Sequence, residues 1–218
     1  MKLKHHHYTR TAYALSISAA LLYSLWFIGY IFNPKALASL DVSILQSKGQ
    51  PHYEFFVVGD IATGLLVILL VACLVKIFHR TQVHKQISFW LCMIGLLAFG
   101  IMTAAASLFP SCDSNSNFCV VNLSQVFDVH NVTGTIASLG QFLSLINALV
   151  IAHKKVSTRV SRSALLLLVL WAISGLIFIT LSTNSLHASL LFQHLFLVLS
   201  SLLLVAVPWV LIKSRQTP

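Results

Sequence analysis

The chain divides into long apolar segments separated by short polar stretches. Six segments of about 20 residues carry almost only apolar side chains, and they cover residues 12–32, 55–78, 87–109, 131–152, 164–182 and 188–212. About 20 apolar residues are what a helix needs to cross the hydrocarbon core of a bilayer. The runs are unbroken rather than alternating, which favours helices over the strands of a barrel. We therefore predict an all-α bundle of six transmembrane helices.

The composition agrees with a membrane protein and limits the kinds of partner that we expect the chain to bind. The 218 residues are 57% hydrophobic and only 9% charged, whereas about 25% of residues are charged in soluble domains. This deficit excludes an ordinary soluble domain, a disordered chain and a coiled coil. The spans and short loops occupy nearly the whole chain, so residues 1–218 are expected to form one transmembrane domain. The expected partner is the lipid bilayer, with a lipid or small-molecule ligand as a further candidate and no nucleic acid.

The positions of the basic residues predict the orientation. In a six-span arrangement, all but two of the 14 Lys and Arg residues fall on one side, the exceptions being Lys35 and Lys48. The acidic residues, including Asp41, Asp113 and Asp128, lie at or near the other side. Basic loops stay in the cytoplasm, so both termini are expected to be cytoplasmic. The net charge of +9 is therefore a signal of topology rather than of nucleic-acid binding.

An alternative interpretation treats the first apolar segment as a secretory signal peptide. Lys2 and Lys4 precede the segment, and Ala36-Leu37-Ala38 follows it in the place of a cleavage site. However, the run is longer and more aromatic than a typical signal-peptide core, and its removal would leave five spans and break the charge alternation. We therefore expect the first segment to be a transmembrane helix.

Asp60 is the most informative single residue. It follows Gly59 in the second span, about 8 Å along a helix from Phe55. A carboxylate at this depth costs about 2–3 kcal/mol on the scale derived from insertion experiments, and such residues usually face the bundle interior and mark a site. The structural alternative is a hydrogen bond to a neighbouring helix, or a neutral aspartic acid.

The fourth and sixth spans supply matching polar faces. His130, Gly134, Ser138, Gln141 and Ser144 recur at steps of three or four residues, so they share one side of a helix. Gly134 and Ser138 could alternatively form a small-residue packing seam between helices. His187 and His194 share a face of the sixth span, about 10 Å apart along its axis, and an interhelical hydrogen bond is the alternative role of His194.

These residues suggest a metal site, and two cysteines suggest a disulfide. Asp60, His130 and His194 all fall in the outer half of the predicted bundle, where an Asp and two His side chains with an open position would suit hydrolytic zinc. The same three could instead relay protons or bind a cation. Cys112 and Cys119 share a polar loop on the oxidising side and are expected to form a disulfide.

Three motifs in residues 12–152 are typical of one family. They are Asp41-Val-Ser43-Ile-Leu45 with Gly49-Gln50-Pro51 and Gly59-Asp60 through Gly64, then Leu108-Phe109-Pro110-Ser111-Cys112, then Asp128-Val129-His130. In this order and spacing they resemble the domain-of-unknown-function 998 family of prokaryotic membrane proteins. The resemblance implies a six- or seven-helix membrane bundle of no settled activity, located in the prokaryotic cytoplasmic membrane. It also singles out Ser43, Asp60 and His130.

The same residue types are similar to those of a superfamily of membrane hydrolases that contains alkaline ceramidases and progestin-type receptors. That superfamily typically carries a His-x-x-x-His pair in its last span. The present chain departs from the pattern, because His187 and His194 are too far apart in sequence. Likeness of fold is in any case a weak argument for function.

Three hypotheses of function are therefore compatible with the sequence. The first is a membrane-embedded lipid hydrolase, in which Asp60, His130 and His194 hold a metal or act as acid and base and Ser43 lies at the pocket mouth. The second is a small transporter or ion-binding protein with Asp60 as its titrating site. The third is a scaffold or accessory protein whose polar residues only join helices.

Overall fold

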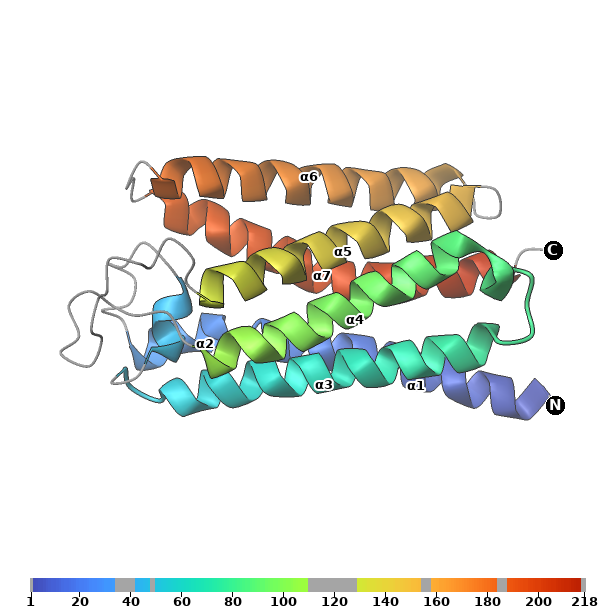
Figure 1. The fold of residues 1–218 in the computed structure, drawn as a ribbon, viewed down its shortest axis with the longest axis horizontal. Helices are drawn as coiled ribbons and strands as arrows, with labels where there is room; N and C mark the ends of the chain where they lie inside the picture. The colour runs from blue at the N-terminus through green and yellow to red at the C-terminus, as the bar shows by residue number, and fades with distance from the viewer. Residues whose placement is uncertain are drawn as a thin grey trace.

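The computed structural model describes residues 2–33, 42–47, 50–109, 129–153, 158–183 and 188–216. This part of the chain is a bundle of long helices without strands (Figure 1). The α-helices are α1 (Lys2–Tyr23), α2 (Trp26–Phe32), α3 (Tyr53–Phe78), α4 (Ile87–Leu108), α5 (Val129–His153), α6 (Thr158–Thr183) and α7 (Ala188–Gln216), with short 3₁₀ turns η2 (Val42–Gln46) and η3 (Val83–Lys85).

Six helical segments are long and apolar enough to cross a membrane, which confirms the predicted number. They are His7–Phe32, Tyr53–Phe78, Ile87–Leu108, Val129–His153, Ser161–Leu181 and Leu190–Arg215. Each lies within about five residues of a segment predicted from hydropathy, the difference being that helices continue past the apolar run into polar residues at the interface.

The first span differs from the prediction because it is not one continuous helix. It is interrupted at Ser24 and Leu25, which separate α1 from α2. The Ser24 hydroxyl donates to the carbonyl of Ala20 at 2.9 Å, and the Ser24 and Leu25 amides donate to carbonyls only three residues back. Such local bonds tighten and bend a helix. Helix α2 begins after this break, and its Trp26 and Tyr30 contact His194 on α7.

Two reciprocal glycine contacts place α4 directly between α3 and α5. A Cβ on Gly100 of α4 would lie 2.9 Å from the carbonyl oxygen of Gly64 on α3, and Gly64 faces Gly100 in the same way. A Cβ on Gly140 of α5 would lie 2.6 Å from the carbonyl oxygen of Gly95 on α4. Helices α3, α4 and α5 therefore lie backbone to backbone, as small residues permit in membranes.

The remaining helices complete the bundle on the other side. Helix α1 packs against α3 and α7, and α6 packs mainly against α7 at the edge of the bundle (Figure 1). The structure does not support the alternative role of Gly134 as a packing residue, because a Cβ there would meet no atom of the described residues within 4 Å. The close approach of α5 occurs at Gly140 instead.

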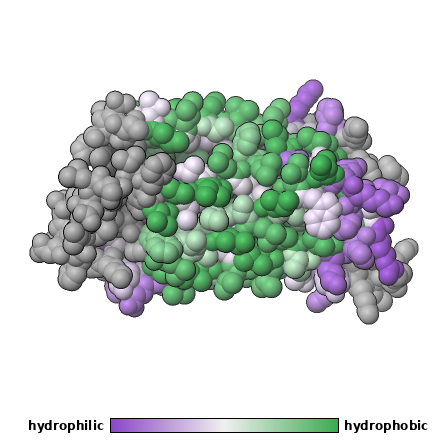
Figure 2. All heavy atoms as spheres, viewed as in Figure 1, coloured by the Kyte–Doolittle hydropathy of each residue, from purple (hydrophilic) through white to green (hydrophobic). Residues whose placement is uncertain are grey.

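The two ends of the bundle differ in charge. The start of α1 and the end of α7 lie at one end, and every Lys and Arg of the described ranges lies near this end, which we call the basic end. Figure 2 shows the same division, with a band of apolar side chains across the middle and polar ones at the basic end. The opposite end, where η2 lies, is called the distal end below.

The glycine contacts give a matched test of the packing. We expect Gly140→Ala to lower the free energy of unfolding by about 1–3 kcal/mol, because its new methyl group would meet the α4 backbone. Gly134→Ala, on the same helix, should change it little. Thermal unfolding in detergent, followed by circular dichroism, measures both. Equal effects of the two variants would contradict the assignment of the α4–α5 contact.

Candidate functional site

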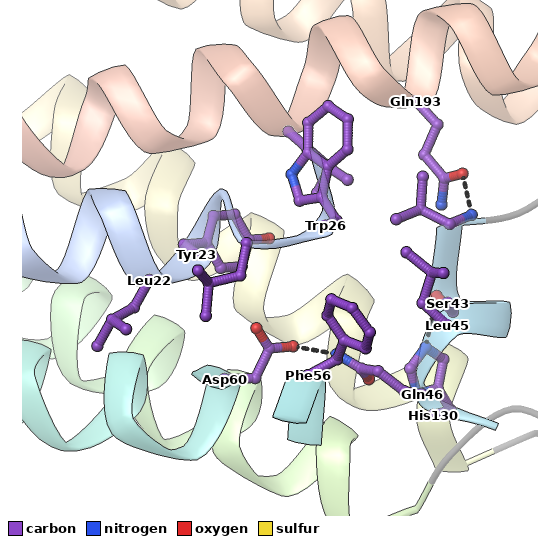
Figure 3. A pocket seen from close by; sticks show the side chains of 13 residues that line it. Leu22, Tyr23, Trp26, Ser43, Leu45, Gln46, Phe56, Asp60, His130 and Gln193 are labelled. Carbon is purple, nitrogen blue, oxygen red and sulfur yellow. Dashed lines mark hydrogen bonds between the residues drawn. The ribbon is translucent and has the colours of Figure 1, made fainter. Parts of the chain in front are cut away.

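A polar cavity at the distal end brings together three of the residues singled out from the sequence. Its volume is about 120 Å³, and Ser43, Asp60 and His130 all line it (Figure 3). The rest of the lining comes from α1, α2, η2, α3 and α7, through Leu22, Tyr23, Leu25, Trp26, Val42, Leu45, Gln46, Phe56, Gln193 and Leu197. Elements distant in sequence thus meet around one small space, which has room for water or a small polar group.

Asp60 reaches the cavity from the second turn of α3. Gly59 beside it lets the junction of α1 and α2 approach closely, since a Cβ at Gly59 would lie 2.8 Å from Leu25 Cδ1. The carboxylate oxygen Oδ2 accepts two hydrogen bonds, from Gln46 Nε2 at 2.5 Å and from the Ser107 hydroxyl at 3.2 Å. Asp60 therefore connects η2 and α4 to α3, and it does so with neutral donors on a single oxygen.

Ser43 and His130 form a nucleophile–base pair. The imidazole Nε2 of His130, in the first turn of α5, lies 2.9 Å from the Ser43 hydroxyl oxygen. Its Nδ1 lies 3.0 Å from the Ala106 carbonyl oxygen, which can only accept, so Nδ1 must carry a proton. When the ring is neutral, Nε2 is then the acceptor, and the Ser43 hydroxyl donates to it. This is the arrangement in which histidine activates a serine.

These contacts close into a ring of hydrogen bonds. Gln46 follows Ser43 by three residues on η2, and Ser107 follows Ala106 directly on α4. Asp60 therefore holds, through Gln46 and Ser107, the same two segments that present Ser43 and the Ala106 carbonyl to His130. We call this arrangement the Asp60 ring. Its members come from α3, α4, α5 and η2, so the position of the Ser43–His130 pair depends on all four.

Apolar packing and one amide fix η2 in place. Leu45 is buried against Gly29 of α2, where a Cβ would lie 2.6 Å from Leu45 Cδ1. The backbone N–H of Val42 donates to the side-chain oxygen of Gln193 on α7 at 2.8 Å. Sequence reasoning missed Gln193 and Gln46. The available signal for Gln193 was a polar residue beside His194 in an apolar span.

A larger groove opens on the other side of the Ser43–His130 pair. Its volume is about 530 Å³, and it shares Ser43, His130, Gln193 and Leu197 with the polar cavity. The groove lies between α5 and α6 with α7 as its floor, and its walls are mostly apolar: Leu139, Phe142, Trp171, Ala172, Leu176, Phe178, Ile179 and Phe196. The pair therefore stands where a polar cavity and an apolar groove meet.

The polar face predicted on the fourth span has two roles. Its distal half, with Gly134 and Ser138, lines the groove. Its other half makes structural contacts: Gln141 Nε2 donates to the Ser200 carbonyl at 2.8 Å, and the Ser144 hydroxyl lies 3.5 Å from Cys92 Sγ. Trp171 Nε1 donates to the Ser200 hydroxyl at 2.8 Å. The two bonds to Ser200 join α5 and α6 to α7, and the contact of Ser144 with Cys92 joins α5 to α4.

His194 does not join Asp60 and His130. Its Nε2 lies 2.7 Å from the Tyr30 hydroxyl, and its ring stacks on Trp26 with centroids 4.6 Å apart. Among the residues that the structure describes, no three His, Cys, Asp or Glu side chains are grouped closely enough to hold a metal ion. The structure thus separates His194 from the other two residues of the expected zinc site, and His194 has the interhelical hydrogen bond foreseen as its alternative role.

Some expected features fall outside the described residues. Cys112, Cys119 and His187 are among these, so the disulfide stays a prediction. Cys73 and Cys92, in α3 and α4, are free thiols.

Fold and site together define a helical multi-pass membrane protein with a polar cavity that adjoins an apolar groove at one end. The chain belongs to the family described as protein of unknown function (DUF998), whose sequence pattern matches residues 16–210. The match confirms the family resemblance and extends it across the last two spans, where no motif of the family had been identified. No curated protein and no solved structure was found to match the chain.

The hydrogen bonds of His130 predict its tautomer. We expect the neutral ring to carry its proton on Nδ1, because the Ala106 carbonyl accepts from that atom. The ¹⁵N spectrum of protein labelled at histidine should contain one Nδ1–H signal that disappears in His130→Gln. If the signal that disappears in His130→Gln is instead typical of the Nε2–H tautomer, the Ser43–His130 geometry is contradicted.

Proposed function

We propose that this protein is an integral membrane hydrolase that cleaves an acyl ester of a lipid, with Ser43 as the nucleophile and His130 as the base. The observation that carries the proposal is the chain of contacts from Ser43 through His130 to the Ala106 carbonyl, at the junction of the cavity and the groove. A nucleophile within hydrogen-bond reach of a base, with the base oriented by a third group, is the general signature of this chemistry.

The reaction proceeds in two halves. The Ser43 oxygen attacks the ester carbonyl carbon while its proton moves to His130 Nε2, and that proton then passes to the departing alcohol oxygen as the C–O bond breaks. A water molecule next attacks the acyl-serine. His130 takes one proton from the water and returns it to Ser43, which releases the fatty acid. The Ala106 carbonyl stabilises the positively charged ring between the two transfers.

The groove supports a lipid as the substrate. Its walls belong to spanning helices, and two of the wall residues, Leu139 and Leu176, are exposed on the outer surface of the bundle, where lipid would surround them. An acyl chain in the groove would place its ester at the end where Ser43 and His130 lie. Entry from the bilayer between α5 and α6 would then need no passage through water.

Asp60 acts in this proposal as a positioning residue. It touches neither Ser43 nor His130 directly, and it holds η2 and α4 through Gln46 and Ser107. The earlier expectation gave Asp60 a metal or an acid–base role. The hydrogen bonds of the ring favour alignment of the Ser43–His130 pair instead.

Activity of the purified protein in liposomes tests the proposal. We expect Ser43→Ala to lower the rate of fatty-acid release from a fluorescently acylated glycerolipid by at least about 1,000-fold, since the nucleophile is removed. The control is Ser163→Ala, an exposed serine on α6 away from both cavities. Full activity in Ser43→Ala would refute the hydrolase. A wild-type protein that binds this lipid without cleaving it would assign the second candidate, a lipid carrier.

We also propose that the protein lies in a prokaryotic cytoplasmic membrane with its basic end in the cytoplasm, which places Ser43 and His130 at the outer face. The concentration of Lys and Arg at the basic end supports this orientation. A fluorescent protein that folds only in the cytoplasm should be bright when fused after residue 218. An alkaline phosphatase fusion at the same point should be inactive. Active phosphatase there would reverse the orientation.

A further inference from the structure

Asp60 has no Lys or Arg partner among the described residues, and the hydrogen bonds that it accepts leave one carboxylate oxygen open. Both of its hydrogen bonds come from neutral groups and fall on Oδ2, and no donor of the described residues reaches Oδ1. Every described Lys and Arg lies near the basic end, far from the cavity. His130 is the titratable base that shares the cavity, and its two nitrogens face Ala106 and Ser43. A carboxylate at this depth is stabilised by a partner cation.

A second unsatisfied group lines the same cavity. Trp26 is 7% exposed, and its indole Nε1 is buried without a hydrogen-bond partner. Phe27 and His194 stack on the indole with centroids 3.8 and 4.6 Å away, so the ring is held firmly in this position. Trp26 lies across the space from Asp60 and Phe56 (Figure 3). A buried N–H donor without an acceptor is costly, and an oxygen of a ligand would satisfy it.

From these two groups we infer that the polar cavity binds the head group of an amphiphile that carries a primary ammonium beside a phosphate oxygen. The ammonium donates to Asp60 Oδ1 and neutralises its charge, while the phosphate oxygen accepts from Trp26 Nε1. A hydroxyl head group would leave the carboxylate without a counter-charge. A trimethylammonium would offer no N–H to Oδ1. Ethanolamine phospholipids have the required chemistry.

The shape of the two cavities places such a molecule along the whole site. With its head group beside Asp60 and Trp26, its chain would pass Ser43 and His130 into the groove, because these residues line both spaces. The inference rests on the proposed function only in naming the lipid as a substrate. Binding of the head group requires no reaction, and it can therefore be measured separately.

The test uses ether lysophospholipids, which contain no acyl ester for Ser43 to cleave. Native mass spectrometry of the detergent-purified protein would compare the affinities of the ethanolamine, choline and glycerol forms. We expect the ethanolamine form to bind about tenfold more tightly than the glycerol form, and Asp60→Asn to remove this preference. Asn retains an oxygen that accepts from Gln46 and Ser107. Trp26→Phe should weaken all three phosphate-containing ligands severalfold and leave binding of dodecylamine unchanged.

Matched controls separate the head-group site from general effects. Glu54→Gln, an exposed acid on the same helix as Asp60, and Trp90→Phe, an exposed indole near the basic end, should keep wild-type affinities. Equal affinities of the three lipids for the wild-type protein would overturn the inference without any variant. So would an unchanged preference in a folded Asp60→Asn protein, with folding checked by thermal unfolding.

The two proposals fail in different ways. Ser43→Ala should retain the preference for ethanolamine while it loses ester cleavage. If the preference is present but no ester is cleaved by the wild-type protein, the head-group site stands and the hydrolase falls. If esters of all three lipids are cleaved and bound equally, the hydrolase stands and the head-group site falls.

Discussion

The site depends on a half-buried carboxylate inside an apolar bundle, which needs hydrogen-bond donors. In an apolar bundle Asp60 cannot be left without donors, and the donors it accepts from lie on η2 and α4. Those two segments also carry Ser43 and the carbonyl that orients His130. The need to satisfy one carboxylate thus aligns a serine with a histidine 87 residues away in sequence. Partly satisfied polar networks are unfavourable in such surroundings, so the ring is expected to form as a unit.

One part of the bundle is closely packed and stabilises the fold, and another part is loosely packed and contains the groove. Helices α3, α4 and α5 meet through glycines, so their backbones are held at short distances that a methyl group would disturb. Helix α6 packs mainly on α7, and the space it leaves beside α5 is the groove. The ring is anchored on the closely packed side, whereas the apolar groove occupies the loosely packed side. The reacting groups lie at the boundary between the two.

Hydropathy was sufficient to predict the six spans, because each helix must cover its own backbone in lipid and therefore needs a long apolar run. Asp60 and His130 could also be identified from the sequence, as polar residues in apolar surroundings. The family motifs singled out both of them and Ser43. The sequence could not show that these three residues meet in one site. The Asp60 ring depends on which helices are neighbours, and glycine contacts bring α3, α4 and α5 together. For the same reason His194 was grouped with Asp60, although its partner is Tyr30 on the short helix that follows the break at Ser24.

That break has a mechanical consequence. A continuous helix responds to a change in bilayer thickness by tilting as a rod, but the first span has a joint at Ser24 and Leu25, and α2 beyond it is fastened to α7 by Tyr30 and His194. A change in thickness that tilts α1 therefore bends the chain at the joint. Leu25 in this joint and Trp26 directly after it both line the polar cavity. We therefore expect the chain length of the surrounding lipids to influence the width of the cavity.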